Sequence, residues 1–582
     1  MRALASVALL FCLNGSLALG EKPESSTEPL GRVLPIVEPG LTDSVERENE
    51  LFAQTLTKQV SIDFAEVTLL DAIKRLTEIG GIPIRIDRLA LEENAVELHA
   101  KVSIRVRKVS LYSALRWTLK QHKLAFLAEE DGLLVTTQKQ FEERLSRHFY
   151  AVPELLGNAA DHDSLIETVT AVVEPDSWEE LGGPGTIAPF NNGEMVGQTQ
   201  PQHVRIARLF EHLEALQKTP NDPYPTASRL VSLFPDQTIA IDQALHTKQM
   251  TIEFDQVPLT DVIATLNQQG RITFYLDHQG LEDWGLEPTV PVTLEKGTYT
   301  QKRLLDLIAR QAELAWYIAG DMVVITTEDV VESDLEIRVY PVRDLACCGL
   351  DLTDPQVRDI VFPPEMNRNY SSTSAYLCAD ATDPGHMINL PDYDSLFELL
   401  TTTVEAESWE DLGGPGSMYA FTWKADCLVI AHTQSAHRKI AAALALIRKK
   451  QMPVDTKAFL AEIEKRNQEI YVRTHLIIGN AELDIPSPSA DDLKRLVEQI
   501  RARIAPESWD GKTTYVTVMK DRLVVRHRRS VQHEVTGYLL DLRVIGDFRG
   551  SSCRGPFHGG YRPPQISAFQ SEAPPVPVPE VH

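Results

Sequence analysis

Apolar and polar positions alternate near the start of the chain and then change their spacing. At 60–64 apolar side chains occupy every second position, which is typical of a half-buried strand. From 69 to 76 they recur every three or four residues, as in an amphipathic helix. Thr68 directly precedes this run, and Asp71 lies three positions after Thr68. This spacing is typical of a helix N-cap. The pattern therefore predicts a strand followed directly by a helix.

The same pattern returns further along the chain. Eight positions within 60–76 recur within 250–266, each displaced by 190 residues, and 133–137 recurs as 323–327 with the same displacement. Such self-similarity is the signature of duplicated folding units. We predict the order β-α-β-β-α-β-β for each copy. The residues expected to cap the second helix of the two copies are Ser110 and Thr300.

A second unit follows each copy of the first. Ser177–Gly185 recurs as Ser408–Gly416, and a degenerate third version lies at Pro506–Asp510. Around it we predict a strand at 150–155, a helix from Ser164, a hairpin at Asn191–Gly193 and a last helix from Pro201. The expected unit is β-α-β-β-α, with both helices on one face of a three-stranded sheet.

The helix predicted after residue 160 begins in a polar run, Asp161–Ser164, whose residues resemble catalytic groups. Ser164 with Glu167, and Ser395 with Glu398 in the later copy, have the spacing of a capping box. We therefore interpret these residues as a helix start.

The chain is thus predicted to be an α+β array of small domains. The expected segments are a signal peptide at 1–20, a linker at 21–49, the first unit at 50–140, the second unit at 147–217, a linker at 218–239, the first unit again at 240–330, the second unit again at 336–450 with an insertion at 346–390, a degenerate second unit at 471–543, and a Pro/Gly-rich tail at 544–582 whose composition is typical of disorder.

The N-terminus has the anatomy of a secretory signal peptide. Arg2 precedes the apolar run 3–13, and the small-residue segment 18–20 fits a cleavage site before Glu21. Beyond it no stretch reaches 18 consecutive apolar residues, so we expect no transmembrane span in the mature chain. The expected location is the periplasm or the extracellular space.

Both units resemble domains of one known protein family. The first unit, with its strand, its Val67-x-Leu69-x-Asp71-x-Ile73 helix and its closing 133–137 strand, resembles the secretin and TonB short N-terminal domain. The second unit, with Leu428–Ile430 and a helix from Thr433, resembles the KH-like periplasmic domain of secretins. The resemblance implies a non-catalytic periplasmic scaffold whose small domains contact protein partners of the cell envelope or pack side by side.

The sequence departs from secretins after Leu540. Secretins continue into a membrane barrel, and a transmembrane strand needs about 9–11 residues of alternating pattern. Only a Pro/Gly-rich segment, 544–582, follows here. The expectation is a secretin-like array without the secretin barrel.

Charge limits the range of partners. The net charge is −26, and nucleic-acid affinity depends mainly on Lys and Arg that neutralise phosphates. The segment Gly182–Gly185 has the Gly-x-x-Gly spelling of a nucleic-acid clamp, but the unit at 147–217 carries 3 Lys/Arg against 11 Asp/Glu. We therefore expect no nucleic-acid partner.

The repeated tryptophan and glycine segments are the strongest candidates for a binding feature. Core packing beside a tight turn is the favoured interpretation, and a carbohydrate or cell-wall platform is the alternative. The residues concerned are Trp178, Gly182, Gly183, Gly185, Trp409, Gly413, Gly414, Gly416 and Trp509.

Cysteines and histidines offer weaker candidates. In an oxidising compartment Cys347 or Cys348 is expected to pair with Cys378 and so to close the insertion. A zinc site that includes His386 matches no usual ligand spacing, so no metal or cofactor is expected. An enzyme housed in 346–390 stays as a third hypothesis.

The repeated histidines His203 and His437 are interpreted as surface or capping residues. They lie near the start of the last helix of the second unit. No catalytic motif is found around them.

The excess of acidic residues is uneven. It lies in 147–217 and in 248–327, where 6 Lys/Arg face 11 Asp/Glu, whereas 471–543 has 12 Lys/Arg against 10 Asp/Glu. A cationic patch is predicted at Arg526, Arg528 and Arg529. Self-association guided by this charge difference is expected to depend on salt.

Overall fold

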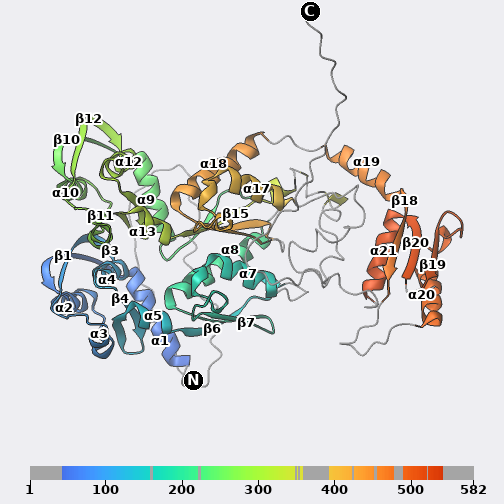
Figure 1. The fold of residues 1–582 in the computed structure, drawn as a ribbon, viewed down its shortest axis with the longest axis horizontal. Coiled ribbons are helices and arrows are strands. Elements are labelled where there is room, and N and C mark those ends of the chain that lie inside the picture. Colours follow the sequence, from blue (N-terminus) through green and yellow to red (C-terminus); the bar gives the residue numbers. More distant parts are fainter. Residues whose placement is uncertain are drawn as a thin grey trace, which may run out of the picture.

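The computed structural model describes residues 42–156, 162–219, 224–347, 392–421, 425–450, 455–477, 489–520 and 522–541, together with 350, 354, 356 and 357. We call the copies of the first unit A1 (50–140) and A2 (240–330). The copies of the second unit are B1 (147–217), B2 (336–450) and B3 (471–543). Figure 1 shows A1 in blue below A2 in green, and B1 in teal below B2 in gold. The predicted signal peptide, the tail at 544–582 and most of the insertion lie outside the described residues.

Unit A1 contains two small sheets. Its elements are α1 (Thr42–Thr57), β1 (Gln59–Thr68), α2 (Leu69–Gly80), β2 (Ile84–Ile86), α3 (Arg88–Glu93), β3 (Lys101–Ser110), α4 (Leu111–Lys120), β4 (Leu124–Glu129), β5 (Gly132–Thr137) and α5 (Gln138–Glu143). Strands β1 and β3 pair antiparallel, while β5 lies between parallel β2 and antiparallel β4. Thr68 and Ser110 cap α2 and α4 as predicted.

Unit A2 repeats this topology. Its elements are α9 (Pro235–Thr247), β10 (Gln249–Pro258), α10 (Leu259–Gln269), β11 (Phe274–Leu276), α11 (His278–Asp283), β12 (Pro291–Thr300), α12 (Gln301–Ala312), β13 (Ala315–Ala319), β14 (Met322–Thr326) and α13 (Glu328–Ser333). The sheets are β10-β12 and β11-β14-β13. The duplication predicted from the 190-residue displacement is therefore a structural duplication.

Unit B1 places two helices against one face of a three-stranded sheet. Its elements are β6 (Ser146–Ala151), α6 (Pro153–Leu156), α7 (His162–Val172), β7 (Thr186–Phe190), β8 (Gly193–Gln198) and α8 (Gln200–Gln217). The strand order is β6-β8-β7. Tyr150 and Val196 of the sheet share a core with Leu165 of α7 and Ile206 of α8.

Unit B2 repeats B1 with one added strand. Its elements are β9 (Arg229–Val231), β15 (Glu336–Pro341), α14 (Arg343–Ala346), α17 (Tyr393–Thr403), β16 (Ser417–Phe421), β17 (Cys427–His432) and α18 (Gln434–Lys450). Strand β9 pairs with β15 at the edge of the sheet. Both β9 and the start of α9 lie in the segment 218–239 that we expected to be a linker, and α1 begins before the predicted end of the first linker.

The predicted capping boxes of the second unit are wrong. Helix α7 begins at His162, so Ser164 is a buried residue of its first turn. Helix α17 begins at Tyr393, and the side chain of Asp392 accepts from the Ser395 amide as N-cap. In the second copy the Asp392 side chain, three positions earlier, takes the role that we assigned to Ser395.

Unit B3 is the degenerate third copy. It comprises α19 (Thr456–Asn467), β18 (Ile470–Leu476), α20 (Ala490–Arg503), β19 (Tyr515–Met519), β20 (Arg522–Arg528) and α21 (Arg529–Asp541). The strand order β18-β20-β19 matches that of the other B units.

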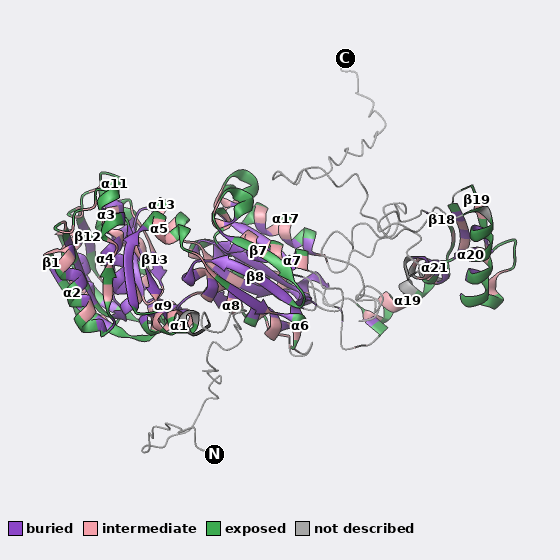
Figure 2. Cartoon of the chain, turned by 90° about the horizontal axis from the view of Figure 1, so that it is seen from below, coloured by how far each residue is buried: buried purple, intermediate pink, exposed green. Residues whose placement is uncertain are grey.

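The two copies pack on each other in the same way. The core of A1 extends into A2 through the outward side chains of the A2 sheet, among them Tyr275, Tyr317 and Val324. The core of B1 likewise extends into B2 through Val339, Val429 and other outward side chains of its sheet. Figure 2 shows the buried strands at the centre of these layers. Helices of the first copy thus cover the sheets of the second.

Candidate interaction surfaces

One stripe of helix α4 carries the contact between A1 and A2. Ser113, Arg116, Trp117 and Lys120 lie three or four residues apart, so they share a face of the helix. Each of them meets a residue of A2 or of the segment that follows A2. The contact therefore joins a helix of one copy to the outer sheet face of the other.

An aromatic pair lies at the centre of this contact. The ring centroids of Trp117 and Tyr275 are 5.1 Å apart, with an interplanar angle of 53°. The Lys120 ammonium lies 4.5 Å from the centroid of the Trp117 ring. Such a pair contributes about 0.5–1.5 kcal/mol beyond the area that it buries.

Three carboxylates of the second copy receive the polar groups of α4. The Asp277 side chain, only 2% exposed, accepts from Lys120 at 3.1 Å. Asp321 accepts from the Ser113 hydroxyl at 2.6 Å and also from the Ser110 amide. Asp334 pairs with Arg116 at 2.9 Å. Because one partner in each contact comes from A1, the polar groups hold the two copies in one register.

The Asp334 carboxylate is the most strongly held of these groups. Burial alone raises its pKa, but Arg116, Arg205 and the hydroxyl of Tyr317 outweigh burial and lower the pKa below its usual value. The Tyr317 hydroxyl donates to it at 3.1 Å. Asp334 therefore stays ionised, and its charge is directed toward A1.

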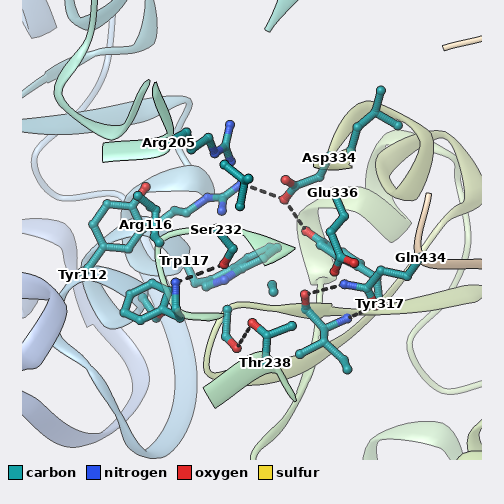
Figure 3. Close-up of a pocket in the computed structure, with 18 residues that line it drawn as sticks. Tyr112, Arg116, Trp117, Arg205, Ser232, Thr238, Tyr317, Asp334, Glu336 and Gln434 are labelled. Atoms are coloured by element: carbon teal, nitrogen blue, oxygen red, sulfur yellow. Dashed lines mark hydrogen bonds and ion pairs between the residues drawn. The ribbon is translucent and has the colours of Figure 1, made fainter. Parts of the chain in front are cut away.

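A small cavity lies where A1, A2, B1 and B2 meet (Figure 3). Its lining includes Tyr112 and Arg116 from A1, Arg205 from B1, Thr238 from A2 and Gln434 from B2. The cavity volume is about 60 Å³, whereas ligand pockets usually hold about 300–1,000 Å³. The space accommodates water molecules and belongs to the junction.

In each copy, one glutamine joins the A unit to the B unit that follows it. The Gln200 side chain of α8 accepts from the Ala128 amide and donates to the Ala128 carbonyl, both at 2.9 Å. Gln434 of α18 makes the same pair of bonds with Ile318, at 3.0 and 2.9 Å. Ala128 and Ile318 are equivalent under the 190-residue displacement, so both copies use the same joint.

Units B1 and B2 also meet through helix-to-sheet contacts. The Ser417 hydroxyl donates to the Ala171 carbonyl at 2.6 Å, and the Tyr419 hydroxyl donates to the Glu167 carboxylate at 2.6 Å. Glu167 is thus a contact between units, not the member of a capping box that we predicted.

The predicted tryptophan and glycine residues form tight turns with buried rings. Trp178 and Trp409 are each 2% exposed, and both indole N–H groups donate to a backbone carbonyl at 2.7 Å. Trp509 is partly buried and donates to the Ile504 carbonyl at 2.8 Å. Because these rings are packed inside their units, they offer no flat face to a sugar.

The glycines of these turns meet steric demands. Gly182 has a φ of +91° and Gly413 one of +86°, a region that favours glycine. A Cβ at Gly183 would lie 2.2 Å from the backbone carbon of Ser177, and Gly414, Gly185 and Gly416 are similarly confined. The turns are therefore explained by packing.

The repeated histidines are core residues, so their interpretation as surface or capping residues is wrong. The Tyr150 hydroxyl lies 2.8 Å from His203 Nδ1, and the Tyr340 hydroxyl lies 2.9 Å from His437 Nδ1. Burial lowers the pKa of His203 to about 3. A neutral ring suits this apolar site, which the sequence spacing did not reveal.

A second histidine contact explains part of the polar run before α7. His162 Nδ1 lies 2.6 Å from a carboxylate oxygen of fully buried Glu194. Burial raises the pKa of Glu194, although its contact with His162 opposes that rise. His162 thus compensates a buried acid, while Asp161 lies outside the described residues.

The remaining candidates are scattered. Cys347 is buried, and Cys348 and Cys378 lie outside the described residues, as does His386. Arg526 and Arg528 lie on β20, and Arg529 begins α21, although its side chain is not described. The predicted bridge to Cys378 therefore falls outside the described residues.

The described part of the chain shows neither a membrane-spanning helix nor a cluster of metal ligands. There, no helix combines the length and the apolar character that crossing a bilayer requires. The same residues contain no group of three or more His, Cys, Asp or Glu side chains placed to hold a metal ion.

The residues of the A1–A2 contact were missed at the sequence level. A signal was present in the comparison of the two copies. Arg85 and Glu129 on the outer sheet face of A1 become Tyr275 and Ala319 in A2. The loss of charge at equivalent positions indicates a face that is covered in A2.

Comparison with known proteins gives only structural neighbours. No family model and no curated protein matches the chain. A structure of XcpQN012 is 14% identical over 36% of this chain and 78% of its own, with a TM-score of 0.12. The N-terminal domain of the secretin XcpQ from Pseudomonas aeruginosa is 12% identical over 51% of this chain and 98% of its own, with a TM-score of 0.11.

The third neighbour is an atomic model of InvG, PrgH and PrgK, basal body proteins of the Salmonella SPI-1 type III secretion injectisome. It is 9% identical over 50% of this chain and 45% of its own, with a TM-score of 0.15. TM-scores this far below 0.5 assign no function. The chain is thus similar, at low identity and over part of its length, to secretin N-terminal domains and to secretion basal body proteins.

Proposed function

We propose that this protein is an exported, non-catalytic scaffold that binds protein partners in the cell envelope. One observation carries the proposal: the charged groups Arg116, Lys120, Asp277 and Asp334 hold unit to unit. Charged contacts between units hold the units in a fixed arrangement, so residues of different units together form one rigid surface. Such a surface suits protein binding. The signal-peptide pattern and the resemblance of both units to secretin periplasmic domains support the envelope as the location.

The carbohydrate hypothesis loses its basis because Trp178 and Trp409 are buried. The hypothesis of an enzyme in 346–390 falls on a segment that lies mostly outside the described residues. Two experiments separate it from the scaffold function, namely partner capture and deletion of the insertion.

Partner capture tests the scaffold function directly. The full chain, which keeps the predicted signal peptide at 1–20 and carries a C-terminal tag, is cross-linked in the intact envelope and purified, and the cross-linked residues are mapped. We expect reproducible partners whose cross-links fall on units A1 to B3. Absence of any envelope partner would contradict the proposal. So would hydrolase activity that disappears when residues 346–390 are deleted.

A further inference from the structure

The outer sheet face of A1 is exposed, although the same face of A2 is covered. On A2 this face carries Asp277, whose side chain is 2% exposed beneath α4. On A1 the side chains of Arg85, Asp131 and Arg144 are 49%, 63% and 42% exposed. Leu127 and Leu134 of the same strands are buried, at 9% and 8% exposed, so this face of A1 exposes mainly its charged side chains. A1 thus has the docking face without the docked helix.

The helix surface that would complement this face of A1 lies on A2. Helix α12 of A2 is the equivalent of α4. The residues of α12 that correspond to the contact stripe are Arg303, Asp306, Leu307 and Arg310, in place of Ser113, Arg116, Trp117 and Lys120. Arg303 and Arg310 are exposed, and Asp306 and Leu307 are half-buried.

The charges of these two surfaces match when the internal contact is carried over by 190 residues. The pair Lys120–Asp277 becomes Arg310–Asp87, which keeps its polarity. The contact of Ser113 with Asp321 becomes Arg303 opposite Asp131. Both would bring an arginine to a carboxylate.

The third pair is reversed. Arg116–Asp334 becomes Asp306 opposite Arg144, so both residues change sign and the attraction is kept. All three charged positions are therefore complementary. A like-charge pair at any of the three positions would oppose association.

The apolar centre of the carried-over contact is smaller. Trp117 on Tyr275 is replaced by Leu307 opposite Arg85. Within A1, Arg85 also pairs with Asp131 at 2.6 Å, and Arg144 pairs with Glu129 at 2.8 Å and with Asp87 at 3.6 Å. Within A2, Asp306 pairs with Lys302 at 2.7 Å. A contact of this kind between chains is therefore weaker than the internal one, and it depends more on charge.

We infer that the chain associates with further copies of itself head to tail, with α12 of one copy docked on the β2-β5-β4 sheet of the next. The inference rests on the proposed scaffold function and names its partner as a second copy. Because the two surfaces differ, the contact is heterologous, and repetition gives a closed ring or an open filament.

Charge reversal in two separate chains tests this inference. Arg303→Glu places like charges opposite Asp131, and Asp131→Arg places like charges opposite Arg303. Each variant alone is expected to associate about fivefold or more weakly than the wild type in sedimentation velocity. In an equimolar mixture, every junction between unlike variants has opposite charges, so assemblies in which the two variants alternate are expected to regain wild-type association.

A second pair of variants and a control variant distinguish loss of the contact from misfolding. Asp306→Arg and Arg144→Asp are expected to behave like the first pair, each weak alone and restored by mixing. Lys74→Glu reverses an exposed charge on α2, outside both faces, and is expected to associate like the wild type. Circular dichroism confirms the fold of each variant.

Three results would overturn the inference: a chain that stays monomeric, association that the reversals do not weaken, or a mixture that fails to recover. A heteromeric complex on this face with a chain that is monomeric alone would overturn it as well. This last outcome leaves the scaffold function standing, since partner capture is measured separately.

Discussion

Single residues in this chain owe their roles to burial and to one fixed partner. Trp178, His203 and Glu194 have reactive or binding side chains, yet each is enclosed in a B1 core and bonded within it. An enclosed group contributes to stability and to rigidity. It does not reach a substrate.

Truncation of Trp178 should destabilise B1. Trp178→Ala removes a buried ring and its hydrogen bond to Val173, so we expect a loss of about 3–5 kcal/mol in the free energy of unfolding. The exposed neighbour Leu181 serves as the control, because Leu181→Ala should change stability by less than about 0.5 kcal/mol. Urea unfolding measures both. Equal, small effects would show that the ring is not a core residue.

The buried histidine should make B1 sensitive to acid. The folded pKa of His203 is about 3, below its ordinary value of 6.5, because burial disfavours the charged ring. Its contribution to stability is present above the unfolded pKa and is lost as pH falls from about 6.5 toward about 3. The neighbouring His148, stacked at 3.8 Å, has its pKa lowered to about 4 by burial and acts in the same direction.

Replacement of His203 tests this pH dependence. In His203→Gln the fall in stability between pH 6 and pH 4 should be shallower by about 1.4 kcal/mol per pH unit. Gln202→Ala, which changes no titratable group on the same helix, should leave the slope unchanged. Unfolding free energies measured across this pH range decide the matter, and parallel wild-type and His203→Gln curves would refute the assignment.

At the scale of elements, a single amide joins helix α8 to strand β4. Gln200→Ala leaves the amide and carbonyl of Ala128 without their partner in a buried site, at a cost of about 1–3 kcal/mol. We expect faster hydrogen exchange at the Ala128 amide. Gln202→Ala, two positions along the same helix, is the matched control. Unchanged exchange at Ala128 would show that Gln200 does not join A1 to B1.

The elements that repeat were predictable from apolar spacing, because strands and helices with one buried face leave distinct periods in the sequence. Helix caps at Thr68 and Ser110 were predictable for the same local reason. Strand β9 was not, since its three residues, Arg229–Val231, are too few to show a period. Its pairing with β15 is set by distant residues.

The contact between copies was also beyond the reach of periodicity. Arg116 and Lys120 look like ordinary solvated charges on α4, and their partners Asp334 and Asp277 lie more than 150 positions away. The continuous apolar run at 322–325 was compatible with a strand covered on both faces. Only the fold shows that α4 supplies the second cover.

At the scale of the whole molecule, the chain is two unit pairs layered helix to sheet, followed by B3 (Figure 1). The expected assembly on the Arg526 and Arg528 patch stays a prediction. The contact that the described structure shows uses discrete pairs between A1 and A2. This contact supports the scaffold proposal and serves as the pattern for association between chains.

The most direct test is a double-mutant cycle on Arg116→Met and Asp334→Asn. Its readout is hydrogen exchange at the Ser110 amide, which donates to Asp321 across the contact and so reports separation of A1 from A2. We predict a coupling of about 1–3 kcal/mol between the two substitutions. Additive effects within about 0.3 kcal/mol would contradict a docking contact built on this pair.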